Sequence, residues 1–579
     1  MRTFKVGVYS ECLKILSNFI VMIYKLYIDF IKDHLFTYIL YILTFLYIPL
    51  NKVGLPHYYG KLISIIKKKN MDEIKNIFLV LIFIWSVYQF LNLVSSRIGS
   101  YLQPKFISYI RKYIINEVIE RHKNNYEDLK LGEILTKIIN SPYILYDVFQ
   151  TIRNFLFTNI IFIVSTFIYL FYHNKLLGCV YLLCISFVIG ICIIYTKTCE
   201  SKVIISESIY DYTHEEIEDT LSNIISVYTS NKTIDEKDRL GEFSYKTSQA
   251  EQELNKCNNN FKIIYSITFI IIFIVLNLLS FKLYLNNTYK IGTLISVVII
   301  NYSILTTLMT IYYDTRFFID TKGRLDILQG FMDRLPKKDN QKYDDNIIEK
   351  ANKLDNISIF IQNLTFGYTD KNIFKNLNLE FKPNETTAII GGIGSGKSTI
   401  AKLIIRLKNY QYGKILLNDM EINKIPIDNL RGIVGYIPQH PKLFNRTLYE
   451  NITYGINGKI TETQIFDILE TNEINDIIPD FKRLMNKKVG KNGSLLSGGQ
   501  RQIVWLLRFL FNNHKIIILD EPTSSLDNKN KEKVIKLIKE LEKTKTIIII
   551  THDKELLKYV KRIIEFNKGE IIDDKRIKT

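Results

Sequence analysis

The sequence is 579 residues long, with a formal net charge of +18, 47% hydrophobic residues and 23% charged residues. This length excludes a single domain, and a positive mean hydropathy at that charge content indicates an apolar half beside a polar half. The excess positive charge suits a protein facing anionic lipid headgroups, and no basic patch interleaved with aromatic residues indicates a nucleic-acid partner.

The N-terminal region, residues 1–33, is predicted to hold an interfacial helix. Its amphipathic stretch, about Leu13–Ile31, is interrupted by Lys25 and Asp29, so we do not expect it to cross the membrane. An uncleaved targeting signal is the alternative, since the small-residue cleavage site of a removable secretory peptide is missing.

Residues 34–334 are predicted to form a transmembrane domain with six spans. The apolar runs lie at about Leu35–Leu50, Ile77–Val94, Phe155–Phe171, Leu176–Tyr195, Ile263–Leu285 and Ile291–Tyr312. About sixty polar and mixed residues separate the second span from the third, and again the fourth from the fifth. Lys and Arg crowd both excursions and the chain after Lys322, so the positive-inside rule places them on one side, in the cytosol.

The last span carries a polar face. Its residues recur at alternating steps of four and three, which places them on one side of a helix: Tyr302, Thr306, Met309, Tyr313 and Arg316. A cation in a span indicates a functional site, whereas Arg316 in a cytosolic extension would simply face water, and both interpretations stay open. Cysteines near the fourth span lack metal-ligand spacing and are predicted to be small apolar packing residues: Cys179, Cys184, Cys192 and Cys199.

A glycine-rich loop follows a linker predicted at 335–356. Gly391 to Ser398 reads G-G-I-G-S-G-K-S, which fits G-x-x-x-x-G-K-[ST] between an apolar strand and an apolar helix. Such a loop presents backbone N–H groups and a helix N-terminus to phosphate, while Lys397 adds a full charge and Ser398 a ligand for Mg²⁺. The predicted phosphate-binding residues are Gly391, Gly392, Gly394, Ser395, Gly396, Lys397, Ser398 and Thr399.

Two more apolar runs end in polar residues. Ile516 to Leu519 leads into Asp520 and Glu521, which suits a parallel strand buried on both faces whose tip delivers carboxylates to a ligand. Asp520 is expected at the Mg²⁺, and Glu521 is expected to polarise the attacking water as a general base. The same pattern recurs before His552, which places this imidazole at the same sheet edge.

Leu496 to Gln500 reads L-S-G-G-Q and opens an apolar helix. Ser497 is predicted to cap this helix while Gly498 and Gly499 expose their N–H groups, which makes a second anion-binding helix start. Because Lys397 already serves the one γ-phosphate of a nucleotide, we expect the second site to close over a nucleotide held by another copy.

Together, these motifs resemble the nucleotide-binding domain of ATP-binding cassette (ABC) transporters over residues 357–579. The resemblance implies that Tyr368 stacks on adenine, Gln439 senses Mg²⁺, Ser525-Leu526-Asp527 communicates across a dimer, and His552 is the switch histidine. The implied cofactors are ATP and Mg²⁺. Beyond the loop, the implied nucleotide contacts are Tyr368, Ser497, Gly498, Gly499, Gln500 and Asp527; the metal ligands are Ser398, Gln439 and Asp520; and the catalytic set is Glu521, His552, Gln439 and Lys397.

The whole chain resembles a half-size ABC exporter of the subfamily B type. The implied fold is an all-α six-helix transmembrane domain followed by an α/β P-loop NTPase domain. One chain carries one phosphate loop and one signature helix, the helix that Leu496–Gln500 opens. The implied partner is therefore a second half transporter. We expect a homodimer, with a heterodimer as the alternative, embedded in a lipid bilayer with the ATPase domain in the cytosol, or on the matrix side of an organelle. The resemblance implies coupling helices near Tyr126–Glu133 and Asn231–Asp238 and export by alternating access.

Two stretches, Leu50–Pro56 and Tyr312–Asp320, resemble mitochondrial-type and heavy-metal-tolerance half transporters, which implies a glutathione-linked or metal-linked substrate. A lipid, peptide or drug exporter and an ATP-gated channel or regulator are the alternatives. The chain departs from the family where Lys491 and Asn492 replace an acidic residue between two glycines, and where Trp505 and Leu507 occupy usually small positions. We expect altered local packing there and intact hydrolysis.

Overall fold

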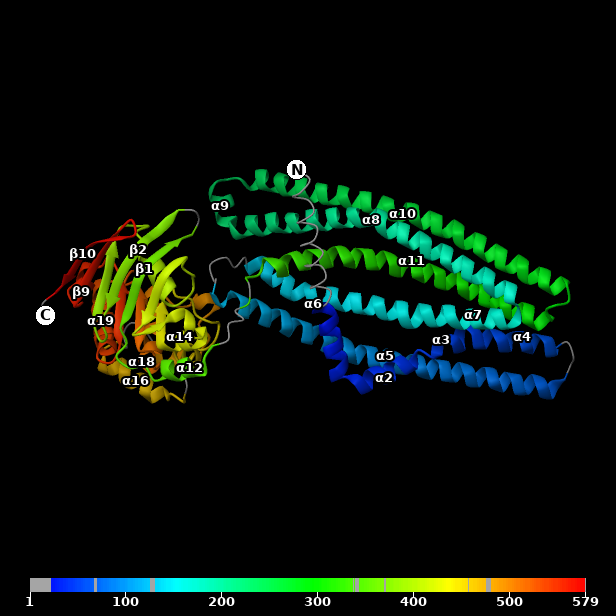
Figure 1. Cartoon of the computed structure of the whole chain (residues 1–579), viewed down its shortest axis with the longest axis horizontal. Coiled ribbons are helices and arrows are strands. Elements are labelled where there is room, and N and C mark those ends of the chain that lie inside the picture. Colours follow the sequence, from blue (N-terminus) through cyan, green and yellow to red (C-terminus); the bar gives the residue numbers. More distant parts are fainter. Residues whose placement is uncertain are drawn as a thin grey trace. The chain divides into compact units, whose positions relative to one another are not determined.

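The computed structural model describes residues 22–66, 70–124, 131–336, 338, 343–368, 371–456, 458–474 and 481–577. The chain divides into two compact units, Met1–Ile119 with Leu129–Pro336 and Glu120–Asp128 with Lys337–Thr579. The first unit is helical and the second is built around β-sheets (Figure 1). This division agrees in kind with the predicted fold class.

Among the described residues, six helical segments are long and apolar enough to cross a membrane. The first is α2 (Leu35–Thr44), α3 (Tyr47–Pro49), the π-helix η1 (Leu50–Gly54) and α4 (Leu55–Ile66), and the second is α5 (Met71–Arg121). The third is α6 (Leu131–Arg153), the π-helix η3 (Asn154–Ile160) and α7 (Ile161–His173). The last three are α8 (Lys175–Ser222), α10 (Thr233–Leu285) and α11 (Ile291–Arg334). Residues 22–33 are also helical, and their interfacial position stays a prediction.

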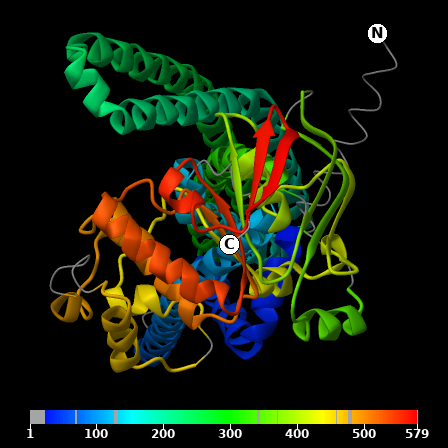
Figure 2. The ribbon, with the colours of Figure 1, turned by 90° about the vertical axis from the view of Figure 1, so that its left-hand side faces the viewer.

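The long excursions are continuations of the spans. Helices α8 and α10 have 48 and 53 residues. At 1.5 Å per residue each is about 70–80 Å long, more than twice the thickness of a bilayer core. They run side by side and are joined through α9 (Ile224–Thr229), as Figures 1 and 2 show. A tight turn with Asn231 at φ 54° separates α9 from α10, within the predicted second coupling segment. The first coupling segment lies partly outside the described residues.

A disulfide joins Cys199 of α8 to Cys257 of α10. The prediction that Cys199 is only a packing residue is therefore wrong. The facing helices bring the two Cα atoms to 6.1 Å, a separation that suits a disulfide, and no sequence spacing reveals which helices face each other.

Two interruptions of the α-helical pattern face the same partner helix. The π-helices η1 in the first span and η3 in the third both pack against α11. A π-turn contains one more residue than an α-turn and redirects the side chains around it, and such turns are frequent at functional sites. Both segments bring polar side chains to α11, as described below.

The second unit contains two sheets. One is antiparallel, in the order β2 (Asn372–Phe381), β1 (Ile359–Gly367), β4 (Tyr412–Leu417) and β5 (Met420–Glu421). The other has the order β10 (Glu570–Arg576), β9 (Arg562–Asn567), β3 (Thr386–Gly391), β8 (Thr546–Ile550), β7 (Ile516–Asp520) and β6 (Val434–Ile437). All its strands except β10 pair in parallel.

The central strands are buried on both faces, as predicted. Ile517 and Leu519 of β7 contribute to one hydrophobic core, whereas Ile516 and Ile518 contribute to the other. β8 alternates in the same way. Helix α18 (Gly498–Phe511) belongs to the first core and α13 (Lys397–Ile404) to the second, so helices cover both faces of the sheet. The carboxyl ends of β3, β6, β7 and β8 therefore meet at one edge.

The half-buried His514 should make this unit sensitive to acid. Burial lowers the pKa of His514 from 6.5 to about 4, and its Nε2 lies 3.1 Å from the carbonyl oxygen of Arg431. As pH falls from 6.5 towards 4, His514 binds a proton in the unfolded chain but stays neutral in the folded chain. The folded state should therefore lose up to about 3 kcal/mol.

Thermal unfolding of the protein at pH 7.0 and 5.0 should show about 2 kcal/mol of this loss, and a smaller loss in His514→Asn. The exposed His440 provides the matched control, His440→Asn, which should behave as the wild type. An equal loss in both variants would contradict this assignment.

Candidate functional site

The glycine-rich loop follows β3 and leads into α13. Gly391, Gly394 and Gly396 adopt φ values of 140°, 76° and 101°, which L-residues with side chains rarely adopt. A Cβ on Gly396 would also lie 2.7 Å from the ring of Phe374. The loop needs glycine at these positions, and its curled backbone is the concave N–H arrangement that binds anions.

The loop has unsatisfied polar capacity that fits a phosphate. The Lys397 ammonium donates to the carbonyl oxygens of Gly391 and Gly392 at 2.7 and 2.9 Å. The buried hydroxyl oxygen of Ser395 makes no hydrogen bond within the described part of the chain. Burial lowers the pKa of Lys397, while Glu521 and Asp520 raise it, so the cation lies within electrostatic reach of both carboxylates.

Asp520 is the last residue of β7 and is buried. Burial raises the pKa of its carboxyl, and the hydroxyls of Ser398 and Tyr436 oppose that shift. The Tyr436 hydroxyl on the neighbouring strand β6 donates to Asp520 at 3.1 Å. The carboxylate is thus held beside the hydroxyl at the start of α13, a pair of oxygen donors of the kind that Mg²⁺ prefers.

Glu521 follows directly in a strained backbone conformation with φ 51°. Its N–H donates to the Ile550 carbonyl oxygen at 2.8 Å, and its own carbonyl accepts from the Gln502 amide at 3.1 Å. Burial raises the pKa of its carboxyl, and His552 lowers it. The carboxylate oxygen lies 3.8 Å from His552 Nε2, so the structure brings these two predicted residues together.

Two predicted residues lie at the margins of this group. Tyr368 has an exposed ring, and its hydroxyl lies 3.5 Å from Thr399 Oγ1. Gln439 is exposed and follows β6 by two residues, on the sheet edge where Asp520 ends β7. An exposed aromatic ring beside the phosphate loop is a suitable stacking surface for a base.

The L-S-G-G-Q segment starts α18 with a full capping box. Ser497 Oγ accepts from the Gln500 N–H at 3.2 Å, and Gln500 Oε1 accepts from the Ser497 N–H at 2.8 Å. A Cβ on Gly498 would lie 2.9 Å from Ser525, and one on Gly499 would collide with Leu526. Asp527 caps α19 (Asn528–Glu542) by accepting from the Asn530 N–H at 2.8 Å. The signature segment and the Ser525–Asp527 loop therefore form one packed unit.

The departures noted in the sequence have local structural roles. The Trp505 indole N–H donates to the Lys442 carbonyl oxygen at 3.1 Å, and the Arg508 guanidinium lies 4.5 Å from the indole ring centre. Trp505 thus ties the signature helix to the loop that follows Gln439. Lys491 begins a short 3₁₀ turn to Gly493, in which Asn492 has φ 57°.

The helical unit contains a polar cavity of about 540 Å³ between the third span and α11. Its polar lining residues are Gln150, Thr151, Asn154, Asp314, Arg316 and Asp320. The Arg316 guanidinium lies 3.4 Å from Asn255 Oδ1 and 4.0 Å from the Asp320 carboxylate, and Asp314 accepts from Asn159 at 2.8 Å. The predicted polar face of α11 thus reaches a cavity with charges of both signs.

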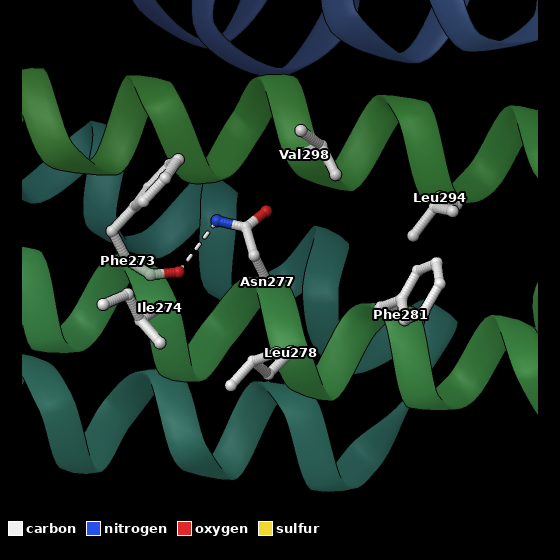
Figure 3. Close-up of a pocket in the computed structure, with 7 residues that line it drawn as sticks. All are labelled: Phe273, Ile274, Asn277, Leu278, Phe281, Leu294 and Val298. Atoms are coloured by element: carbon white, nitrogen blue, oxygen red, sulfur yellow. Dashed lines mark hydrogen bonds between the residues drawn. The ribbon is translucent and has the colours of Figure 1, made fainter.

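A second pocket, of about 360 Å³, lies between α10 and α11 and is almost entirely apolar (Figure 3). Its one polar lining residue, Asn277, donates to the Phe273 carbonyl oxygen at 2.8 Å and accepts from the Asn301 amide at 3.2 Å. Asn277 therefore fastens the two helices together, and the pocket itself suits an apolar group.

The sequence alone does not reveal several supporting residues. Tyr436 opens the Tyr436–Gln439 segment and contacts Asp520, and Gln502 contacts Glu521, but no role is predicted for either from the sequence. The one signal for Tyr436 is its place in that segment, at the end of a strand that pairs with β7. The cavity residues Gln150, Thr151 and Asn154 were missed because they lie ahead of the apolar run of the third span.

These observations define a membrane protein whose helical domain is joined to a nucleotide-binding ATPase domain. Family models for the ABC transporter transmembrane region and for the ABC transporter match residues 38–309 and 374–524. The chain belongs to the ABC transporters and is a half-size exporter, an ATPase-coupled transporter integral to a membrane.

Relatives agree with this assignment. An ATP-binding/permease protein assigned to export in Rickettsia prowazekii is 24% identical over 518 residues, which cover 84% of this chain and 85% of that protein. The mitochondrial iron-sulfur clusters transporter ATM1 of Kluyveromyces lactis is 36% identical over 220 residues, 37% of this chain and 30% of that protein. The ATP-dependent lipid A-core flippase of Francisella tularensis is 30% identical over 216 residues, covering 37% of this chain and 36% of the flippase. The solved structure of a bacterial Atm1-family ABC exporter with ATP bound has the same fold, with a TM-score of 0.80 at 19% identity over 93% of this chain and 95% of that one.

Proposed function

We propose that two copies of this chain use ATP to export a small zwitterionic, peptide-like compound, with glutathione-linked compounds as the substrate class. The observation that carries this proposal is the cavity with both charge signs beside Arg316. A glutathione-linked compound carries carboxylates, an ammonium and amide groups, which match a guanidinium, two carboxylates and the side-chain amides of Gln150 and Asn154. ATM1, similar over 220 residues, is by name a transporter of iron-sulfur clusters, which fits the metal-linked part of the predicted substrate class.

In this proposal the sheet edge performs the hydrolysis. The loop from Gly391 to Gly396 and the Lys397 ammonium hold the phosphates, and the Tyr368 ring stacks on the base. Glu521 orients and deprotonates the attacking water, and His552 positions the Glu521 carboxylate. Ser398, Gln439 and Asp520 would hold Mg²⁺, which neutralises charge on the phosphate oxygens.

The L-S-G-G-Q segment contributes to the site of a second copy. Ser497 and the N–H groups of Gly498 and Gly499 form an anion-binding helix start separate from the phosphate loop. Two chains placed about a two-fold axis then make two equal nucleotide sites, so a homodimer is sufficient. Closure of the dimer on ATP favours one arrangement of the spans, and hydrolysis releases it, which gives alternating access.

Arg316 provides the test of the substrate class. Glutathione disulfide should stimulate the ATPase of the wild type in nanodiscs. In Arg316→Met the half-maximal concentration should rise about tenfold, because a charge-assisted contact is lost. The exposed Arg97 offers the control, Arg97→Met, which should leave stimulation unchanged. If no glutathione compound stimulates the ATPase and none is taken up by vesicles that contain the protein, the proposed substrate class is wrong.

A lipid substrate is the second candidate. The apolar pocket between α10 and α11 would accept an acyl chain, and the flippase similarity points the same way. Stimulation by lipid, with no response to glutathione compounds, would favour this candidate.

A further inference from the structure

A lysine side chain lies within the first membrane span. Lys52 belongs to η1 and is half-buried. Its ammonium donates to Thr306 Oγ1 of α11 at 3.3 Å and lies 5.9 Å from the ring centre of Phe162 on α7. Both contacts are to neutral groups, and Lys52 takes part in none of the ion pairs found among the described residues.

Helix α11 gives the depth of this ammonium. Thr306 precedes Arg316 by ten residues, which is about 15 Å along a helix. Ser296 precedes Thr306 by ten more, and its hydroxyl lies 3.4 Å from the His57 carbonyl oxygen of α4. The apolar run of this span, about Ile291–Tyr312, is about 30 Å long, the thickness of a bilayer core. Thr306, which contacts the Lys52 ammonium, lies inside that run, six residues or about 9 Å from its Tyr312 end.

The local backbone explains how a lysine reaches this position. η1 is a π-helical turn between α3 and α4, and it packs against both α7 and α11. η3 of the third span packs against the same α11, lines the polar cavity with Asn154 and binds Asp314 through Asn159. Two irregular turns therefore bring polar groups to one helix at two depths.

An ammonium inside the core of a bilayer is costly unless it faces the bundle interior and meets a counter-charge. We propose that Lys52, with Thr306, is a carboxylate-binding site in the transport path, which an anionic substrate reaches after leaving the cavity at Arg316. The inference rests on the proposed function in one respect: the substrate carries a carboxylate. Lys52 then favours the acids over analogues whose carboxylates are esterified.

The first experiment compares an S-alkyl glutathione with its dimethyl ester as stimulators of the ATPase in nanodiscs. The wild type should respond to the acid at about tenfold lower concentration than to the ester. Lys52→Met should reduce this preference to the part that Arg316 supplies, and Lys52→Arg should keep it in full. The exposed Lys61 of α4 supplies the control, Lys61→Met, which should match the wild type. A preference in Lys52→Met equal to that of the wild type would overturn the proposal.

A second experiment needs no substrate. In Thr306→Cys, peptide mass spectrometry follows the reaction of position 306 with an anionic and a cationic methanethiosulfonate reagent. The anionic reagent should react about tenfold faster, and adding Lys52→Met should abolish the difference. Equal rates in both backgrounds would overturn the anion site. A rate difference without stimulation by any glutathione compound would support the anion site and reject the substrate class proposed above.

Discussion

Replacing Glu521 by glutamine should lower the rate of ATP hydrolysis about 10²–10⁴-fold and leave ATP binding intact, because glutamine keeps the shape of the side chain without its basic carboxylate. The position is suited to this role. Its backbone is strained at φ 51°, and its carboxylate lies 3.8 Å from His552. Functional sites are where such strain is retained.

Phosphate release and binding of a fluorescent ATP analogue by the protein in nanodiscs would measure the two effects separately. The exposed Glu532 of α19 gives the control, since Glu532→Gln removes a carboxylate from the same domain. Loss of ATP binding in Glu521→Gln, or hydrolysis within tenfold of the wild type, would argue against a general base at this position.

The same carboxylate predicts how hydrolysis depends on pH. Burial raises the pKa of Glu521 above the ordinary value of 4.5, and only the ionised form accepts a proton from water. Activity should therefore be present at neutral pH and disappear as pH falls through this raised pKa. The acidic limb of kcat at saturating ATP should lie above pH 4.5. The same profile in His514→Asn separates this limb from the loss of stability at His514.

The nucleotide site could be predicted from the sequence because its parts are local. Each motif is contiguous, and the phosphate loop, Asp520 and His552 each follow a strand whose apolar run is visible in the sequence, as with Ile516–Leu519 before Asp520. A parallel sheet then brings those strand ends together whatever the surrounding sequence. The six spans were predictable for a similar reason, since a bilayer requires long apolar runs.

Other features depend on which elements become neighbours. The contact of Tyr436 with Asp520 exists because β6 pairs with β7, and the sequence contains no record of strand order. The π-turn at Leu50–Gly54 adds a residue to one turn without changing composition, so a hydropathy profile passes over it. Lys52 contacts Thr306 only because η1 packs on α11, and Cys199 forms a disulfide only because α8 faces α10.

Mixing two inactive variants should restore ATP hydrolysis. Lys397→Ala removes the phosphate-binding ammonium, and Ser497→Arg blocks the signature helix start, so each homodimer should have two defective sites. In a mixed dimer, one site receives both defects and the other receives Ser497 and Lys397 intact. Random pairing makes half the dimers mixed, each with one intact site, so the mixture should reach about a quarter of the wild-type rate.

A measurement of ATP binding distinguishes two questions: whether each nucleotide site is shared between two chains, and whether hydrolysis requires both sites to be intact. With Glu521→Gln added to both variants, mixed dimers purified through two different tags should retain about one ATP each, and either homodimer close to none. One retained ATP without restored hydrolysis would mean that turnover needs both sites. No retained ATP in the mixed dimer would mean that Lys397 and Ser497 do not meet across two chains. Only a site that combines Lys397 of one chain with Ser497 of the other places both defects in one site and leaves the second site intact. Ser497→Arg should remain folded. The loss of the Ser497 hydroxyl from the capping box of α18 costs only about 1 kcal/mol, far less than the free energy of unfolding of a domain.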